Sequence, residues 1–224
     1  MRVTDSHRGS TLATCPSGVY TVNITGAIPD REFYNCDSLT NVTIGNSVTS
    51  IGNSAFHNCF SLANVTIGNS VTSIGDYAFE SCDSLTNVTI GDSVTSIGRR
   101  AFASCFSCVS FYVSSGNLNF TEIDGVLVSF NLSVLVVFPC GRSGSYTIPE
   151  SVTSIGSSAF YNCDSLASVT IGNSVTSIGN SAFEDCDSLV CLPKKKLRTQ
   201  TRPMGQLFYF GQLWKGDVIP LYSL

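Results

Sequence analysis

Residues 39–61 read LTNVTIGNSVTSIGNSAFHNCFS, and this segment decides the fold because nearly the same wording follows it twice without interruption. The next copies are LANVTIGNSVTSIGDYAFESCDS from Leu62 and LTNVTIGDSVTSIGRRAFASCFS from Leu85. Further copies begin at Ser151 and Ser174, and a degenerate copy precedes the first. Phenylalanines mark the 23-residue period: Phe33, Phe56, Phe79 and Phe102, and later Phe160 and Phe183. Such a period is typical of a solenoid, in which each repeat forms one coil and contacts its neighbours.

Each repeat carries the signals of two short strands and a turn. In the first full copy, residues 42–44 alternate between apolar and polar side chains, and residues 47–51 form a second extended segment. Gly-Asn pairs follow both segments and favour turns, because both residue types tolerate a positive φ. Residues 54–59 suit a short helical turn that directs alanine, phenylalanine and cysteine inward. Stacked coils, with parallel strands about 4.8 Å apart, would bury this apolar face.

The wording resembles the BspA-like subclass of leucine-rich repeats through the pattern L-x-x-V-x-I-x-x-x-V-x-x-I-G-x-x-A-F-x-x-C, over roughly residues 28–192. The longer interval from Phe102 to Phe160 is similar to the hairpin-bearing repeat of that family, with extra strands expected at residues 125–128 and 134–138. The resemblance implies a mostly β, right-handed, curved leucine-rich-repeat solenoid of 23-residue coils. It also implies surface, adhesive and protein-interaction roles, and it supplies no catalytic residues.

The chain divides into three parts. Residues 1–24 are an N-terminal segment or cap, residues 25–192 are the solenoid with a hairpin insertion at about 114–148, and residues 193–224 are a non-repeat basic and aromatic tail. Residues 36–192 carry twelve acidic residues and three arginines, whereas the tail carries six basic residues and one aspartate. The tail is expected to cap the open strand edge or to act as a basic interaction segment; a third interpretation is a truncated repeat array. Its basic run is too short to indicate nucleic-acid binding.

Composition favours a folded protein without a transmembrane segment. Hydrophobic residues make up 43% of the chain and charged residues 12%, which is about half the charged share of ordinary soluble domains. The most apolar stretch, Gly125 to Phe138, is shorter than the ~20 residues of a membrane-spanning helix and contains polar residues. Residues 1–15 lack the apolar segment of a secretory signal, which predicts a cytoplasmic protein if the chain starts here. The family resemblance implies the cell surface or extracellular space if the N-terminus is truncated.

The ten cysteines raise the question of disulfides. Six of them occupy one repeat position: Cys36, Cys59, Cys82, Cys105, Cys163 and Cys186. Stacked coils place such neighbours about 5 Å apart, near the disulfide range, but with parallel side-chain directions that keep sulfur from facing sulfur. We therefore expect buried free thiols that pack as small hydrophobic side chains, in preference to a disulfide framework. Cys108 replaces a core leucine, and Cys15, Cys140 and Cys191 lie off the ladder without an assigned place.

Signals for catalysis, metals or cofactors are weak. His57 stands at a repeat position that other coils fill with varied residues, which indicates a solvated side chain rather than a general base. The serines are part of the repeated sequence, and no partner base is fixed near any of them that would indicate a nucleophile. The sequence contains no nucleotide-binding loop, and its cysteine spacing does not match zinc ligands. One repeat position carries aspartate, for which a turn or cap role is favoured over a row of cation ligands: Asp37, Asp83, Asp164 and Asp187. The sequence therefore predicts no enzyme, no metal and no cofactor.

A recognition surface is expected where the repeats differ. The variable positions precede each phenylalanine: Asn53-Ser54, Asp76-Tyr77, Arg99-Arg100, Ser157-Ser158 and Asn180-Ser181. In-register stacking would place Asp76 beside Arg99 and Tyr77 beside Arg100, with Glu80 on the same coil as Asp76. We take these five residues, together with the hairpin, as the candidate binding surface, because loops on a rigid scaffold commonly carry binding. The alternative is an exposed ion pair worth about 0–1 kcal/mol with no binding role.

The function predicted from the sequence is a non-enzymatic repeat scaffold for protein–protein or adhesive macromolecular interaction. The alternative is a purely structural fragment of a larger cell-surface repeat protein. The expected partner is a protein or a surface macromolecule, because nothing in the chain indicates nucleic acid. The repeats leave the identity of the partner and the oligomeric state open.

Deletion of residues 193–224 tests the cap interpretation of the tail. If the tail covers the last coil, its removal exposes a strand edge, and we expect a lower melting temperature and aggregation on size-exclusion chromatography. Replacing Lys194, Lys195 and Lys196 with serine is the control, since it removes charge but keeps the aromatic residues. Equal melting temperatures and monomer fractions for the full and shortened chains would contradict the cap interpretation.

Overall fold

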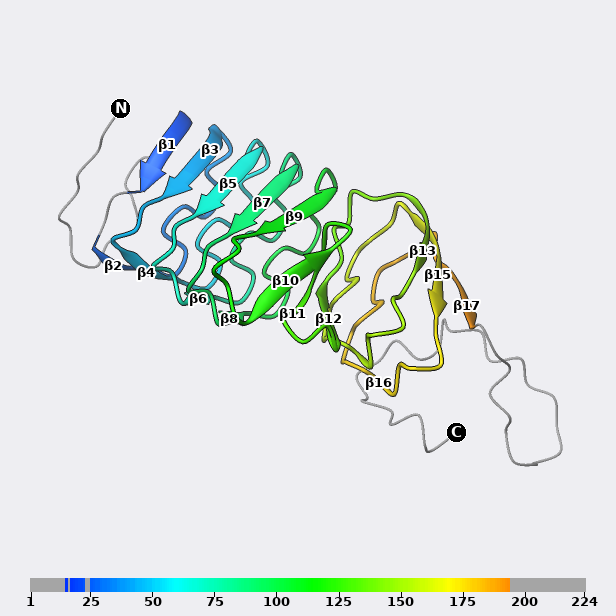
Figure 1. Cartoon of the computed structure of the whole chain (residues 1–224). Coiled ribbons are helices and arrows are strands. Elements are labelled where there is room, and N and C mark those ends of the chain that lie inside the picture. The colour runs from blue at the N-terminus through cyan, green and yellow to red at the C-terminus, as the bar shows by residue number, and fades with distance from the viewer. Residues whose placement is uncertain (1–14, 16, 23–24, 194–224) are drawn as a thin grey trace, which may run out of the picture.

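The computed structural model describes residues 15, 17–22 and 25–193, in which every regular element is a strand (Figure 1). The strands in chain order are β1 (Gly18–Val22), β2 (Gly26–Ile28), β3 (Leu39–Ile44), β4 (Val48–Ile51), β5 (Asn64–Ile67), β6 (Ser73–Ile74), β7 (Asn87–Ile90), β8 (Ser96–Ile97), β9 (Ser110–Val113), β10 (Phe120–Ile123), β11 (Val126–Ser129), β12 (Val134–Val137), β13 (Gly144–Thr147), β14 (Ser154–Ile155), β15 (Leu166–Ile171), β16 (Ser177–Ile178) and β17 (Val190–Pro193). The predicted mostly β solenoid is confirmed. The predictions of an N-terminal cap and of a C-terminal cap fall largely outside the described residues.

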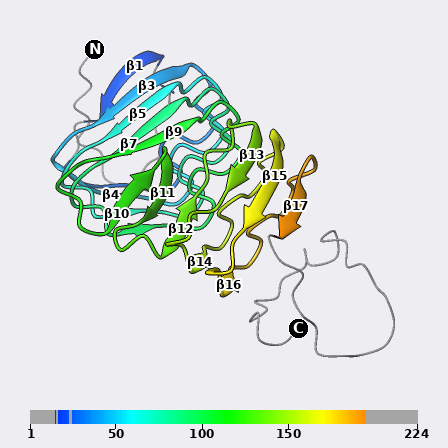
Figure 2. The ribbon, with the colours of Figure 1, turned by 45° about the vertical axis from the view of Figure 1, so that its right-hand side comes forward.

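Successive coils pair their strands in parallel and in the register of the repeat. One sheet has the order β1-β3-β5-β7-β9 and a second has the order β2-β4-β6-β8. In the first sheet Val42 pairs with Val65, which in turn pairs with Val88. After the hairpin, β13-β15-β17 form a third sheet, and β10-β11-β12-β14-β16 form a fourth (Figure 2). Because the register equals the repeat length, each residue lies against its own equivalent in the next coil.

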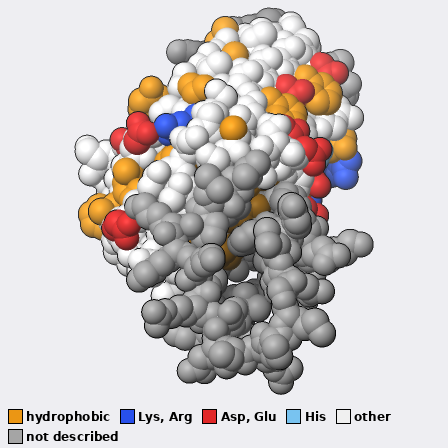
Figure 3. Space-filling view, turned by 90° about the vertical axis from the view of Figure 1, so that its right-hand side faces the viewer, with side chains coloured by type: hydrophobic (Ala, Val, Ile, Leu, Met, Phe, Trp, Pro, Cys, Tyr) orange, Lys and Arg blue, Asp and Glu red, His pale blue; other side chains and the backbone are white. Residues whose placement is uncertain are grey.

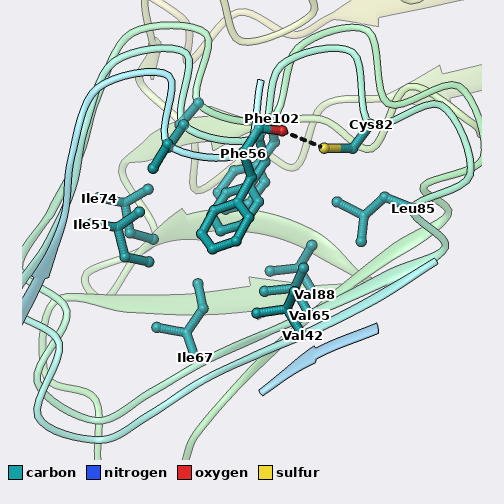
Figure 4. Close-up of a cluster of buried hydrophobic side chains, with 14 of the residues drawn as sticks. Val42, Ile51, Phe56, Val65, Ile67, Ile74, Cys82, Leu85, Val88 and Phe102 are labelled. Carbon is teal, nitrogen blue, oxygen red and sulfur yellow. Dashed lines mark hydrogen bonds between the residues drawn. The ribbon is translucent and has the colours of Figure 1, made fainter. Parts of the chain in front are cut away.

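The core is a set of columns, each built from one repeat position. The rings of Phe33 and Phe56 stack with centroids 4.7 Å apart, Phe56 and Phe79 at 5.0 Å, and Phe79 and Phe102 at 5.3 Å. Figure 4 shows this column of rings beside columns of valine and isoleucine. The rings of the middle coils are 0–2% exposed. Burial of apolar area contributes about 25 cal/mol per Å², so the stack itself is the main stabilising element.

The predicted helical turn at residues 54–59 is wrong. Ser54 and Asn58 both have positive φ angles, of 53° and 60°, and the equivalent residues of other coils do too. A left-handed residue at each end prevents continuous helical geometry. Successive backbone N–H groups therefore donate in alternate directions. The N–H of His57 donates to the Ser54 carbonyl within the turn, whereas that of Phe56 donates to the Ala78 carbonyl of the next coil. The turn thus joins neighbouring coils, which an isolated helical turn does not do.

The expectation of buried free thiols is correct for the regular coils. Cys59, Cys82, Cys105 and Cys186 are free and buried, and each thiol lies 2.8–3.2 Å from the carbonyl oxygen of the phenylalanine one coil earlier. The Cys82 thiol and the Phe56 carbonyl are drawn in Figure 4. Cys108 occupies its predicted leucine position and is 1% exposed. Burial raises the pKa of Cys108 and of Cys186 to about 12, so neither is a reactive thiolate at neutral pH.

Two ladder cysteines contradict the expectation and form disulfides. Cys36 bonds Cys15, with Cα atoms 5.1 Å apart, and Cys163 bonds Cys140, with Cα atoms 4.4 Å apart. Both separations lie in the range of natural disulfides. The argument from parallel side chains fails at these sites because neither partner is a regular repeat cysteine. Cys140 follows Phe138 by two residues, whereas Cys163 follows Phe160 by three, so Cys140 meets the ladder from a different backbone position.

The hairpin forms as predicted, with an additional strand before it. β10 and β11 pair antiparallel, β11 and β12 pair antiparallel, and β12 returns to the solenoid by pairing in parallel with β14. A buried asparagine fixes the entry. The Asn117 side chain donates to the carbonyls of Gly91 at 2.8 Å and Val94 at 3.1 Å, and it accepts the backbone N–H groups of Asn119 and Phe120 at 2.8 Å. The sequence analysis missed this residue, which stands outside the repeat wording.

The hairpin divides the core into two clusters. On one side the Phe102 ring meets Phe111 edge-on at 5.3 Å and ends the regular stack. On the other side a new stack starts, with Phe138 against Phe160 at 4.8 Å. The regular ring column is therefore interrupted between Phe102 and Phe138.

Replacing Phe79 with alanine tests the ring column. The side chain is fully buried between two rings, so its loss leaves a cavity, and we expect a loss of about 3–5 kcal/mol in the free energy of unfolding. Phe60, which is 44% exposed, provides the control, and Phe60→Ala should cost less than about 1 kcal/mol. Urea unfolding followed by circular dichroism measures both. Similar losses for the two variants would show that the column is not the main stabilising element.

Candidate functional site

The variable turn forms a continuous ridge along the solenoid. We define the ridge as these residue pairs: Asp30-Arg31, Asn53-Ser54, Asp76-Tyr77, Arg99-Arg100, Ser157-Ser158 and Asn180-Ser181. The second member of every pair has a φ between 53° and 59°. First members are joined from coil to coil, because Asn53 accepts the backbone N–H of Asp76 at 2.8 Å and Asp76 accepts that of Arg99 at 2.7 Å. The ridge therefore has a rigid backbone and varied side chains.

The stacking places Asp76 next to Arg99, as the register predicts. The contact is a hydrogen bond to the Arg99 backbone rather than an ion pair between side chains. The Asp76 carboxylate accepts the Arg99 backbone N–H, and no ion pair joins the two side chains in the described part of the chain. The backbone N–H of Tyr77 donates to the Arg99 carbonyl at 2.9 Å. The arginine side chain of Arg99 remains available for a partner.

Arg100 makes contacts that the sequence analysis did not identify. Its guanidinium lies 3.6 Å above the Tyr161 ring, and its Nη2 lies 3.1 Å from Glu184 Oε2, a residue 84 positions later. The predicted neighbour Tyr77 provides neither contact. Asn162 and Ser104 also join these coils through a side-chain hydrogen bond of 2.8 Å. Arg100 thus bridges the two sides of the hairpin coil. The only sequence signal was that Tyr161 and Glu184 share the repeat position of Glu80.

Glu80 lies on the same coil as Asp76, near His57 of the preceding coil. Its Oε2 is 3.2 Å from His57 Nδ1, although the angle does not make a hydrogen bond. Burial raises the pKa of Glu80, and the charges of Arg100 and Arg99 oppose that shift. Burial, with a smaller effect of Arg31, lowers the pKa of His57. The predicted residues Asp76, Tyr77, Glu80, Arg99 and Arg100 thus belong to two adjacent coils on one edge of the solenoid.

A cavity of about 250 Å³ lies where the ridge meets the hairpin coil. Residues 97–103 form one wall, Val134 and residues 136–138 form another, and Ser157 and Ser158 contribute from the following coil. Two buried polar atoms among these residues, Arg100 Nε and Ser158 Oγ, make no hydrogen bond. The cavity therefore combines apolar walls with unpaired hydrogen-bonding atoms.

The hairpin coil exposes several large apolar side chains. Leu118 is 73% exposed, Tyr112 53% and Phe130 52%. Arg142 fixes the turn of the hairpin by an ion pair of 2.8 Å with Asp124. Figure 3 shows acidic side chains along one side of the described surface that it presents, with fewer basic side chains. Large exposed apolar side chains are enriched at protein-binding surfaces.

The described residues contain no cluster of three or more side chains suited to hold a metal ion. In the row of repeated aspartates, the Asp164 carboxylate accepts the backbone N–H of Asp187 at 3.2 Å. This contact is the turn role that the sequence favours for the repeat position. In the same part of the chain no helix is long and apolar enough to cross a membrane.

A family model described as "BspA type Leucine rich repeat region (6 copies)" matches residues 26–132 and 137–202. The chain belongs to the BspA-type leucine-rich repeat family. Among curated proteins, none matches this BspA-type chain.

Several solved structures are similar to this BspA-type chain. The pneumococcal vaccine antigen PcpA is 20% identical, with a TM-score of 0.50, and the alignment covers 81% of this chain and 62% of that one. A leucine rich cell surface protein from Faecalibacterium prausnitzii is 26% identical, with a TM-score of 0.42 and coverage of 80% and 69%. The leucine rich repeat protein of T. pallidum is 25% identical, with a TM-score of 0.46 and coverage of 79% and 70%. The likeness to PcpA shows the fold alone.

The lowered pKa of His57 predicts how stability depends on pH. The pKa of the histidine is near 6.5 in the unfolded chain and lower in the folded one, so the unfolded chain binds the proton more readily. The free energy of unfolding therefore decreases as the pH falls below about 6.5. We expect His57→Gln to lose less stability than the wild type between pH 7 and pH 5. The raised pKa of Glu80 has the opposite effect on the pH dependence of stability, and it is present in both the wild type and the variant. The difference between their two pH profiles therefore reports the histidine. Parallel pH profiles of the melting temperature would contradict this assignment.

Proposed function

We propose that this leucine-rich repeat chain is a non-enzymatic scaffold that binds a protein or another surface macromolecule through the ridge and the hairpin. The observation that carries the proposal is the bridge made by Arg100. A repeat surface is otherwise nearly uniform, but at this coil two arginines, the hairpin and a cavity come together. A partner that contacts Arg99 and the apolar rim of the cavity would gain hydrogen bonds and apolar burial at one place.

The proposed location is the cell surface or extracellular space, with adhesion as the role. The two disulfides support this location, because disulfides persist in oxidising compartments and are rare in the cytosol. The family resemblance is in line with the same location. A purely structural role within a larger surface protein remains the rival outcome of the experiment below.

The experiment measures capture of partners from the native source by the double variant Arg99→Ala/Arg100→Ala. Arginine is enriched among the side chains that dominate interfaces, and we expect retention of a specific partner to fall at least about tenfold. Quantitative mass spectrometry of the captured proteins gives the readout. The melting temperature of each variant is measured in parallel, since loss of the Glu184 bridge also affects stability.

Arg31→Ala is the matched control for this experiment. Arg31 occupies the same ridge position as Arg100, has a similar φ of 59°, and lies over the ring of Tyr34, far along the stack from the hairpin. Its replacement should leave capture unchanged. Equal capture by the wild type, the double variant and the control would remove the ridge as the binding surface and favour the structural role.

A further inference from the structure

Each regular coil donates hydrogen bonds to the next through its turn. The backbone N–H of Tyr77 donates to the carbonyl of Arg99 at 2.9 Å, that of Phe79 to Ala101 at 2.8 Å, and that of Ser81 to Ala103 at 3.0 Å. Three donors at alternate positions therefore point toward the following coil. The same pattern holds for the coil of Phe56 and, beyond the hairpin, for the coil of Phe160.

The coil of Phe102 breaks this pattern. The equivalent N–H groups belong to Arg100, Phe102 and Ser104, and within the described residues none of them makes a hydrogen bond. The following coil is the hairpin coil. Its turn around Phe138 lacks the two left-handed residues that flank the phenylalanine in regular coils, and it is one residue shorter between Phe138 and Cys140. Its backbone does not supply the missing carbonyls. Two of these three residues, Arg100 and Phe102, line the cavity.

Two side chains add further unpaired donors at the same place. Ser158 is 7% exposed, lines the cavity, and its hydroxyl makes no hydrogen bond. The Nε of Arg100 is likewise buried without a partner, while the rest of the guanidinium contacts Tyr161 and Glu184. Leaving such groups buried and unpaired is unfavourable, because each has lost its hydrogen bond to water. A ligand that accepts hydrogen bonds from them recovers this cost.

The lining defines the chemistry of that ligand. None of the residues that line the cavity carries a carboxyl group. The carboxylate of Glu184 pairs with Arg100 Nη2 from outside the lining and leaves Arg100 Nε without a partner. The walls between the donors are apolar, with Ile97, Val136 and Phe138 among them. A carboxylate accepts up to about four hydrogen bonds, and bonds to a charged acceptor are roughly twice as strong as neutral ones. The apolar walls suit a compact hydrocarbon group attached to it.

We propose that the cavity is a binding site for a carboxylate attached to a compact apolar group. The N–H groups of Arg100 and Phe102, the Arg100 Nε and the Ser158 hydroxyl hold the carboxylate, and the apolar group lies between the Phe102 coil and β12. Both the C-terminal residue of a peptide and a free carboxylic acid provide this chemistry. The proposal goes beyond the scaffold function, because a small carboxylate needs the cavity and no macromolecular partner.

The experiment uses the full chain and defined probes. N-acetyl-leucine and its amide are titrated by ¹⁵N–¹H NMR, together with the tripeptide Gly-Val-Leu as the free acid and as the C-terminal amide. We expect the acids to bind at least about tenfold more tightly than the amides, because the amide loses the charged acceptor. The N–H signals of Arg100 and Phe102 should shift most. Tighter binding of the tripeptide identifies a chain terminus as the source, and tighter binding of N-acetyl-leucine identifies a free acid.

Ser158→Ala and Ser181→Ala form a matched pair. Both serines stand at the same ridge position with φ angles of 57° and 55°, so alanine meets the same backbone cost in both, but Ser158 alone of the two lines the cavity. Ser158→Ala should weaken acid binding about tenfold, and Ser181→Ala should leave it unchanged. Val136→Phe, which fills the cavity, should abolish binding.

Equal affinity for acids and amides, or no binding of either, would overturn the carboxylate site. Equal effects of the two serine variants would also overturn it. These results are separate from those of partner capture. If partner capture depends on Arg99 and Arg100 but the acids do not bind, the scaffold function stands without the carboxylate site. If the acids bind but capture does not depend on the arginines, the carboxylate site stands and the ridge is not the binding surface for a macromolecule.

Discussion

The register between coils is the constraint on which the rest of the structure depends. Each residue lies against its equivalent 23 positions later, as Val42 does against Val65 and Asn41 against Asn64. The side-chain amide of Asn64 donates to that of Asn41 at 2.8 Å, so polar positions also bond to their own copies outside the core. A solenoid in this register has no separate core to fold around, because every coil is the packing partner of the next. A change of length in one coil is therefore felt by both neighbours.

The hairpin coil shows the consequence of such a change. Its insertion supplies β10 and β11 and provides Leu127 and Leu135 to the two core clusters, so burial remains complete at those positions. Its turn is shorter, however, and does not reproduce the hydrogen bonds that the regular turns exchange. The structure compensates on the outer edge with the bridge from Arg100 to Glu184 and leaves a cavity beneath it. The features that distinguish this chain from a uniform repeat thus have one origin.

Much of the fold could be predicted because the repeat carries its information locally. The alternation of Val42 and Ile44 with polar residues predicts a strand, and six copies of the same wording predict the stack. The helical turn was predicted wrongly because the residue type at the position of Ser54 gives no local signal for a positive φ, since Tyr77 and Arg100 adopt it too. The left-handed conformation accompanies the hydrogen bonds between coils. The disulfide of Cys140 was missed because a residue outside the repeat wording has no register from which its position follows.

The period, the parallel strands, the columns of buried side chains and the place of the hairpin follow from the repeated apolar spacing of the amino-acid sequence. Three features emerge only in the folded molecule: Arg100 meets Tyr161 and Glu184, Cys163 bonds Cys140, and donors of the Phe102 coil remain unpaired. All three have the same cause. They depend on how far apart two regular coils lie across an irregular one, and that distance is set by the packing of the hairpin rather than by any local pattern.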